Sequence, residues 1–307
     1  MATSSLTAPH FTDEDAARAY LEGLRWPDGR ICPHCAEVGR AYAAKRLGKY
    51  RCAANKCRKD FTVKVGTVFE ASHIPLHNSL LAAYLLAASK KGMSSHQLMR
   101  MLGVTYKTAR FMMLRLCEAM KAGTFTTPMG GDGKGVEVDE TFIGKKSGAE
   151  VRRGYAHKNA DLSLVEHGGR VMSFHVDGTR CKASASDPQG QHRRRNPHND
   201  RRSRPIHQLK KPFVAHGFIR RGAEQWRKGD AYTNTLEGFF SVFKRGLIGV
   251  YRHCCEQHLH RYPAEFDFRC NHRAKLGITD LDRTHAILAG IEGKRLTYRR
   301  TGGAQAA

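Results

Sequence analysis

The stretch VEVDETFIG, residues 136–144, decides the fold of the second half of the chain. Its apolar and polar residues alternate with a period of two, which is typical of a β-strand with one buried face. Two later stretches, DLSLVEH (161–167) and RVMSFHV (170–176), are separated by two glycines and predict a β-hairpin. We therefore expect a sheet in which Asp139 lies on the first strand.

A second polar pattern lies in NTLEGFFSVFKRG, residues 234–246. Polar residues spaced by three, four and three positions share one helix face: Asn234, Glu237, Ser241 and Lys244. Apolar residues fall on the opposite face: Leu236, Phe239, Phe240 and Phe243. The spacing predicts a helix over 234–247 that is anchored in a core and holds its polar groups rigidly. An ordinary surface helix would carry the same stripe.

Two carboxylates on separate rigid elements indicate metal-dependent phosphoryl transfer. Asp139 and Glu237 are oxygen ligands of the kind that Mg²⁺ or Mn²⁺ prefers. A pair of such ions activates an attacking hydroxyl and stabilises the leaving oxygen in line with it. This chemistry ordinarily uses a third carboxylate, and Lys244 could contact a phosphate beside the site.

Four of the nine cysteines form a group with metal-ligand spacing. Cys32 and Cys35 are followed after sixteen residues by Cys52 and Cys57. Two chelating pairs at this distance can converge on Zn²⁺ as the two knuckles of a zinc ribbon. The alternative is four reduced structural cysteines. The neighbouring Arg58 and Lys59 would place positive charge on the ribbon surface, where DNA phosphates could bind.

Residues 94–120, SSHQLMRMLGVTYKTARFMMLRLCEAM, predict two helices joined by a short turn at Gly103. Ser94 or Ser95 can cap the first helix and Thr105 the second. This is the pattern of a DNA-binding helix-turn-helix, although a plain helical pair would give it too. Residues at the start of the second helix would then meet DNA: Tyr106, Lys107, Thr108 and Arg110.

The charge of the chain favours a polyanionic partner. Its 307 residues carry 52 Lys and Arg against 28 Asp and Glu, a formal net charge of +24. Nucleic acid is the commonest polyanion that such a protein binds. No apolar run approaches about 18 residues, so we expect no membrane span. The first 26 residues lack a secretory apolar core, so we expect a cytoplasmic, nucleoid-associated protein.

Several motifs together resemble one protein family. They are CPHC, YRC…CRKDFTVKVGTVFE, SHIPLH, SSHQLMRMLGVTYKTARFM, VEVDETFIG and NTLEGFFSVFKRGLIGVYRHCCEQHLHRYPAEFDFRCNHR. In this order they resemble the insertion-sequence transposases of the ISXO2-like group in the IS1595 family. The resemblance implies an α+β multidomain protein with an N-terminal zinc ribbon, a helix-turn-helix and a C-terminal ribonuclease H-like catalytic domain.

The resemblance also assigns roles to single residues. It implies a DD(E/N)K transposase that uses two divalent metal ions and acts on double-stranded DNA, both element ends and target. Asp139 then corresponds to the first catalytic aspartate, and Glu237 with Lys244 to the third acid and its basic partner. Some members carry asparagine at the third position, which keeps Asn234 as a candidate. Such enzymes ordinarily work as multimers, so we expect a homo-oligomer.

The chain departs from the family pattern at residues 182–208. A segment like MTDEA, with the second aspartate, ordinarily precedes the LKKPFVAHGF of residues 209–218. Here that place reads NPHNDRRSRPIHQ, and Asp200 falls within one residue of the expected position. It is followed by arginines, whereas the family has an apolar strand and an acid there. Asp200 is therefore the candidate second aspartate in an aberrant context.

A change of reading frame would explain this departure. DNA that encodes RRNPHNDRRSRPIHQL, residues 194–209, can read VAILIMTDEAGQYTNL in a neighbouring frame, which restores an apolar run and the MTDEA word. We hypothesise two compensating frameshifts, and expect the arginine-rich segment to loop out and leave a gap in the sheet. The alternative is a natural basic insertion that binds DNA phosphates. The nucleotide sequence of codons 180–210 distinguishes the two.

These patterns predict three regions and two functions. The regions are 1–70 with an N-terminal helix and the zinc ribbon, 71–122 with the helix-turn-helix, and 136–295 with the catalytic domain. The first function is a transposase that binds element ends, cleaves DNA and joins strands, and that is impaired in this copy if the second aspartate is lost. The alternative is a DNA-binding protein without catalysis, either a decayed copy or a regulator.

Overall fold

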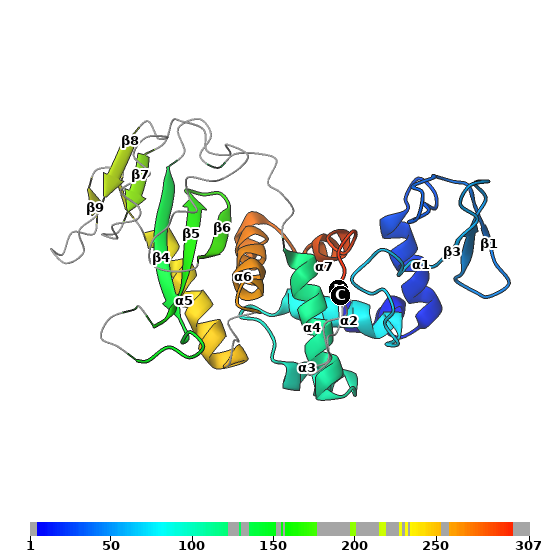
Figure 1. Cartoon of the computed structure of the whole chain (residues 1–307), viewed down its shortest axis with the longest axis horizontal. Helices are drawn as coiled ribbons and strands as arrows, with labels where there is room; N and C mark the ends of the chain where they lie inside the picture. The colour runs from blue at the N-terminus through cyan, green and yellow to red at the C-terminus, as the bar shows by residue number, and fades with distance from the viewer. Residues whose placement is uncertain are drawn as a thin grey trace. The chain divides into compact units, whose positions relative to one another are not determined.

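The chain divides into two compact units (Figure 1). In the computed structural model one unit comprises Met1–Met120 with Gly277–Ala307, and the other Lys121–Leu276. The structure describes residues 5–121, 129, 135–151, 155, 157–176, 234–252 and 258–296, and the backbone alone of 197–200, 215–218, 227–228 and 231–232. Within these residues every helix is too short or too polar to cross a membrane.

The first unit is mainly helical. Its helices are α1 (Glu14–Arg25), α2 (Leu76–Ala88), α3 (Ser95–Leu102), α4 (Tyr106–Met120) and α7 (Asp280–Ala289), with short turns η1 (Ser5–Thr7) and η2 (Pro9–Phe11). Helix α2 is apolar on nearly every side and contacts α1, α4 and α7. A helix that is apolar all round must be buried, and α2 is therefore the core of this unit.

A small antiparallel sheet lies beside α1. Its strands are β1 (Ala41–Ala43), β2 (Tyr50–Cys52) and β3 (Asp60–Phe61), in the order β1-β2-β3. Trp26, Tyr50 and Phe61 are buried and pack with ring centroids 5.9 to 6.0 Å apart. Such tilted and edge-on contacts between large rings are favourable, and they give this small sheet an apolar core of its own.

Helices α3 and α4 begin and end as their sequence predicts. The Ser94 side chain accepts a hydrogen bond from the backbone N–H of Gln97, and the Thr105 hydroxyl accepts one from Thr108. Gly103 ends α3 with a φ of 64°, a left-handed conformation that glycine adopts without strain. The predicted helical pair is therefore present, with both predicted caps.

Helix α7 returns from the second unit to the first. Its buried Ile287 and Leu288 belong to the face that packs against α2 and α4. At Gly290 a Cβ atom would lie 2.3 Å from the carbonyl oxygen of Ala119, so only glycine allows this close approach. The compact second unit ends at Leu276, so α7 lies in the first unit.

The second unit is built on a five-stranded sheet. Its strands are β4 (Val136–Ile143), β5 (Asn159–Glu166), β6 (Val171–Val176), β7 (Pro197–Asp200) and β8 (Ala215–Phe218). The order is β6-β5-β4-β7-β8, with β4, β5 and β6 antiparallel and with β7 and β8 parallel to β4. A separate antiparallel pair is formed by β9 (Arg227–Lys228) and β10 (Ala231–Tyr232).

Strand β7 corrects one expectation. We expected residues 182–208 to loop out and leave a gap, but the backbone of Pro197–Asp200 lies between β4 and β8 and pairs with both. Strand pairing uses backbone groups, so a short polar sequence can still occupy this place. The rest of the segment, 182–196 and 201–208, lies outside the described residues.

Two helices cover one face of the sheet. They are α5 (Asn234–Gly246), which continues as the π-helical turn η6 (Leu247–Tyr251), and α6 (Arg261–Asn271), followed by η8 (Ala274–Leu276). Leu236, Phe239, Phe240 and Phe243 are buried there against Val165 and other apolar residues. The predicted apolar side of the 234–247 helix is thus confirmed as the side that packs in the core.

Helix α6 also closes the edge of the sheet at β6. Asn271 accepts a hydrogen bond from the Val171 N–H at 2.7 Å and donates one to the Val171 carbonyl at 2.9 Å. One turn earlier, Asp267 accepts the Ser173 N–H at 2.7 Å. These side chains satisfy backbone groups of an edge strand that would otherwise be open to another chain.

Candidate functional site

The four predicted cysteine ligands converge in the first unit. Their sulfur atoms all lie within 4.8 Å of one another, with Cys32 and Cys57 3.8 Å apart and Cys35 and Cys52 3.6 Å apart. Tetrahedral Zn²⁺ with Zn–S distances of about 2.3 Å requires sulfur atoms about 3.8 Å apart. The donor set and its spacing therefore fit one zinc ion.

The two knuckles have matching backbones despite their unequal spacing. The residue after the second cysteine of each pair has a left-handed conformation, with φ of 61° at Ala36 and 45° at Arg58. Each of these residues also donates its N–H to the carbonyl four residues before it, that of Cys32 or of Ala54. The four-residue gap between Cys52 and Cys57 thus forms a knuckle like the first.

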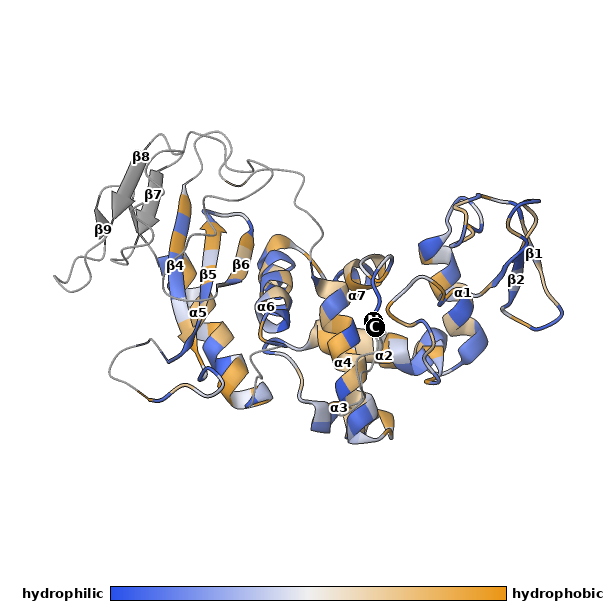
Figure 2. Ribbon diagram, in the orientation of Figure 1, coloured by the Kyte–Doolittle hydropathy of each residue, from blue (hydrophilic) through white to orange (hydrophobic). Residues whose placement is uncertain are grey.

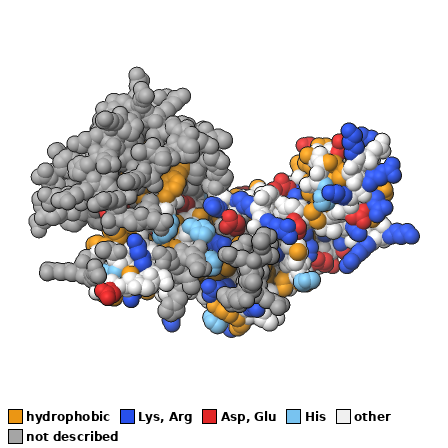
Figure 3. Space-filling model, in the orientation of Figure 1, with side chains coloured by type: hydrophobic (Ala, Val, Ile, Leu, Met, Phe, Trp, Pro, Cys, Tyr) orange, Lys and Arg blue, Asp and Glu red, His pale blue; other side chains and the backbone are white. Residues whose placement is uncertain are grey.

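The ribbon carries the predicted positive charge on its surface. Arg58 and Lys59 are exposed. Asp60 binds Arg51 at 2.6 Å and Lys49 at 2.8 Å, and these cations hold the pKa of Asp60 well below its usual value. Figure 3 shows Lys and Arg side chains gathered over this part of the chain. Because Asp60 stays ionised, it neutralises part of the charge, while Arg58 and Lys59 face solvent.

The predicted DNA-contacting residues lie on the first turns of α4. Tyr106 and Lys107 are exposed, and Tyr106 stacks on His96 with ring centroids 4.4 Å apart. Arg110 donates a weak hydrogen bond to the Tyr106 hydroxyl at 3.4 Å, and Thr108 accepts one from Thr105. These contacts present the four side chains together at the N-terminal end of the helix.

In the second unit, Asp139 lies in the middle of β4 and is fully buried. Figure 2 shows the alternation of apolar and polar residues along this strand. Its backbone pairs with Ser163 on β5, and both side chains lie on the face covered by α5 and α6. A buried carboxylate on a central strand is expensive unless charge or hydrogen bonds balance it, which is typical of a metal or catalytic position.

The polar face of α5 is arranged as its spacing predicts. Glu237 is half-buried in the first turn of the helix, where the helix dipole favours negative charge. Asn234, Ser241 and Lys244 are exposed. Lys244 lies in the last turn, where the dipole favours a cation. The helix therefore presents Glu237 close to the sheet and Lys244 at the opposite end.

Glu137 joins the two elements that carry Asp139 and Glu237. Its buried carboxylate accepts the backbone N–H of Leu236 at 2.9 Å, which fixes the N-terminus of α5 against β4. His167 Nε2 lies 3.1 Å from the other carboxylate oxygen. Glu137 is two residues before Asp139 on the same face of β4, and Leu236 directly precedes Glu237. One hydrogen bond thus fixes the start of the helix that carries Glu237 against the strand that carries Asp139.

Asp200 is described through its backbone alone. It ends β7, whose residues His198 and Asn199 pair with Val136 and Glu137 of β4. The backbone of Asp200 therefore lies beside the stretch of β4 that contains Asp139. The sheet brings the three candidate acids onto neighbouring elements of one unit, while the cysteine cluster and the helical pair α3–α4 belong to the other.

Further buried acids lie on the same face of the sheet. Asp161 on β5 lies 2.8 Å from His175 on β6, and burial raises the Asp161 pKa although the histidine opposes this. Asp267 accepts the hydroxyl of Ser173 at 2.7 Å, and Ser173 lies 2.7 Å from Ser163. Burial raises the pKa of Asp267 to about 7, again against its hydrogen bonds to Ser173. Asp139 on β4, Ser163 on β5 and Ser173 on β6 thus lie side by side in one polar layer across the sheet.

Sequence reasoning missed Glu137, Asp161 and Asp267. The signal for Glu137 was present: an acid two residues before Asp139 must share its face of the strand. Asp161 lies in the predicted hairpin, but nothing local shows that both faces of that strand are buried. The place of Asp267 beside the sheet depends on contacts between α6 and β6, which are about a hundred residues apart in the chain.

The chain is similar to known transposases in both units. Residues 12–60 match the family described as transposase zinc-ribbon domain, and residues 131–271 match the ISXO2-like transposase domain. An uncharacterized protein in transposable element ISH50 of Halobacterium salinarum is 32% identical over 146 residues. This match covers 46% of the chain and 45% of the relative, so the chain spans about half of that relative's length. No solved structure matches the chain.

Proposed function

Because the chain belongs to the ISXO2-like transposases of the IS1595 family, we propose that it binds the ends of an insertion sequence and catalyses metal-dependent DNA cleavage and strand transfer there. The two domain matches support a DNA-cleaving enzyme in general. The particular residues and steps below are our proposal for how this chain performs that chemistry.

Asp139, Asp200 and Glu237 are the proposed ligands of two Mg²⁺ or Mn²⁺ ions. Carboxylates are the donors that these hard cations prefer, and the three residues come from β4, β7 and α5 of one unit. Such ions, when bound, would stabilise charge on the attacking and leaving oxygens of the DNA phosphate. Asn234 and Lys244, exposed on α5, are proposed to contact the DNA backbone beside the cut.

A ribonuclease H-like catalytic domain is the fold we propose for the second unit. Three antiparallel strands followed by two strands parallel to the first, in the order β6-β5-β4-β7-β8, support this assignment. The placement of Asp139 on the central strand β4 supports it too, because a central strand is rigid and holds a catalytic group precisely enough for in-line chemistry.

The first unit is proposed to recognise the DNA ends. A structural Zn²⁺ on Cys32, Cys35, Cys52 and Cys57 would hold the ribbon that carries Arg58 and Lys59. The start of α4, with Tyr106, Lys107, Thr108 and Arg110, would enter a groove of the duplex. A homo-oligomer that joins two ends is part of the same proposal, as is a cytoplasmic, nucleoid-associated location.

One observation carries the catalytic part of the proposal. The hydrogen bond from Leu236 N–H to Glu137 ties the helix of Glu237 to the strand of Asp139. Glu137 is fully buried, and a buried carboxylate on a helix N-terminus makes a strong, charge-assisted contact. The chain thus keeps two acids that are about a hundred residues apart in sequence on elements in direct contact.

Strand cleavage by the purified chain tests this function. The substrate is a duplex that contains the terminal repeats flanking the gene, incubated with Mg²⁺ or Mn²⁺. We expect nicking at the end of the repeat, lost in Asp139→Asn and in Glu237→Gln but kept in Ser241→Ala, an exposed neighbour on α5. Nicking that survives both acid substitutions would refute the assigned site.

A second candidate is a protein that binds DNA without cutting it. The arginine-rich context of Asp200 favours this alternative, because arginines follow the candidate second acid where the family has an apolar strand and a further acid. It predicts binding to the same duplex with no nicking, unchanged by Asp139→Asn. Restoring the family's MTDEA word in place of the residues around Asp200 would then recover cleavage if only this segment has decayed.

A further inference from the structure

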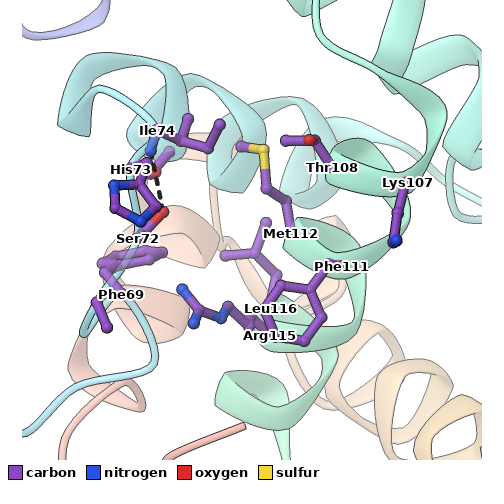
Figure 4. A pocket seen from close by; sticks show the side chains of 12 residues that line it. Phe69, Ser72, His73, Ile74, Lys107, Thr108, Phe111, Met112, Arg115 and Leu116 are labelled. Atoms are coloured by element: carbon purple, nitrogen blue, oxygen red, sulfur yellow. Dashed lines mark hydrogen bonds between the residues drawn. The ribbon is translucent and has the colours of Figure 1, made fainter. Parts of the chain in front are cut away.

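A cavity of about 290 Å³ lies in the first unit between the loop after β3 and helix α4. The loop residues Phe69, His73 and Ile74 form one side, and α4 forms the other (Figure 4). This volume is at the lower edge of small-molecule pockets, which suits a ligand with one or two rings. Lys107 and Thr108, proposed above to contact DNA, lie on its lining, but the interior of the cavity has no role in the functions proposed above.

The interior of the cavity is apolar and its mouth is positively charged. Phe69, Met112 and Leu116 are buried in its wall. Lys107 is exposed at its rim and supplies this charge. A ligand that fits must therefore combine a flat or apolar body with a negatively charged group.

Arg115 supplies a charged group inside this cavity. Its side chain is 9% exposed, and in Figure 4 its guanidinium extends from α4 toward the loop that carries Phe69. One Nη donates to the Glu70 carbonyl at 3.1 Å, and the guanidinium lies over the Phe111 ring, 4.5 Å from its centroid.

Arg115 makes no ion pair within the described part of the chain. Its Nε has no hydrogen-bond partner there. Burial, and then the charge of Arg295, lower the Arg115 pKa, and the carboxylate of Glu70, which itself pairs with Arg295 at 3.9 Å, opposes them only in part. A buried cation that is balanced only in part is costly, so an incoming anion would be bound strongly.

We propose that this cavity binds one nucleotide that has left the base stack of DNA, with its base against the apolar wall and its phosphate between Arg115 and Lys107. Aromatic side chains and arginine planes are the surfaces on which unstacked bases bind. Lys107 and Thr108 line the cavity and also begin the helix proposed to meet DNA, so a strand held there passes the mouth. The proposal rests on the DNA binding proposed above.

Two DNA probes and one free nucleotide test it with the full chain. The probes are a duplex with a single unpaired thymine and the same duplex fully paired; the nucleotide is thymidine 5′-monophosphate. We expect the bulged duplex to bind at least about tenfold more tightly, because no base pair has to open. Lys107→Met should abolish this preference. Arg110→Met removes the same charge one turn along α4 but outside the cavity, and should weaken both duplexes equally.

Arg115→Gln provides a second variant at the charged group. It keeps a donor for the Glu70 carbonyl but loses the cation, and should also abolish the preference. If this variant fails to fold, Lys107→Met still decides the question. The methyl group of Met112, observed by NMR, reports whether thymidine 5′-monophosphate enters the cavity.

The outcomes distinguish a nucleotide within DNA from a free nucleotide, and both from a failure of the proposed DNA binding. Equal binding of both duplexes, with no shift of the Met112 methyl, would overturn the proposal while leaving DNA binding intact. Equal binding with a shifted Met112 methyl would support a nucleotide cavity that takes the free molecule and overturn the DNA source. If neither duplex binds, the proposed function fails, and the Met112 methyl alone then shows whether the cavity binds a nucleotide.

Discussion

Substitution of Glu137 tests how the two catalytic elements are held together. In Glu137→Gln the side chain still accepts the Leu236 N–H, but a charge-assisted bond of about 1.5–3 kcal/mol becomes a neutral one of about 0.5–1.5 kcal/mol. The lost charge at the N-terminus of α5 adds about 0.3–1 kcal/mol. A neutral amide costs less to bury than the carboxylate of Glu137, and this difference raises the stability of the variant. We expect a net loss of about 1 kcal/mol.

Glu137→Ala should cost about 3 kcal/mol, because it leaves the buried Leu236 N–H without an acceptor and opens a cavity. Urea unfolding gives the free energies, and hydrogen exchange at the Leu236 amide shows whether the helix start has loosened. Glu140→Gln, on the opposite face of the same strand, is the control and should change the stability by less than about 0.5 kcal/mol. If Glu137→Gln is as stable as the wild type and the Leu236 amide exchanges no faster, the carboxylate does not hold α5 and the reasoning is wrong.

Three other predictions concern single features. Chelation of zinc, or Cys52→Ser, should unfold the ribbon. Trp26 packs on Tyr50 there, so its fluorescence should shift to the red, measured in a Trp226→Phe background. An unchanged spectrum would show that the ribbon folds without metal. The folded-state pKa of Asp267 is raised to about 7, so the stability that its protonated form contributes is complete below pH 4 and is lost as the pH rises toward 7. The unfolding free energy of the wild type relative to Asp267→Asn should therefore fall by at most about 1.4 kcal/mol per pH unit across that window. A difference that stays constant with pH would contradict the raised pKa. Gly290→Ala should lower the melting temperature, whereas Gly23→Ala, with open space around its Cβ position, should not; equal melting temperatures would refute the close approach to Ala119.

Local signals account for the features that the sequence predicts well. Ser94, Gly103 and Thr105 define the bounds of the helical pair α3–α4, because capping and left-handed turns depend on a few neighbouring residues. The alternation around Asp139 and the stripe on α5 likewise follow from the period of each element. The cysteine spacing predicted convergence correctly, since zinc geometry leaves few alternatives for two chelating pairs.

Features that depend on distant parts of the chain were missed. Nothing near residue 280 shows that α7 packs on α2, because that contact joins segments about two hundred residues apart. The pairing of β7 between β4 and β8 uses backbone groups, which the arginine-rich sequence did not reveal. The charge of Arg115 inside a cavity, like that of Glu137 beneath α5, becomes visible only when the other wall is in place.

The central claim is that Asp139 and Glu237 bind the same pair of cations. Crystals of the chain soaked in Mn²⁺ test it directly, because the anomalous signal locates manganese without reference to any DNA sequence. We predict anomalous peaks in contact with both carboxylates, absent in crystals of Asp139→Asn. Manganese on neither residue, or carboxylates more than about 10 Å apart, would contradict the claim, since no shared ions could then bridge them.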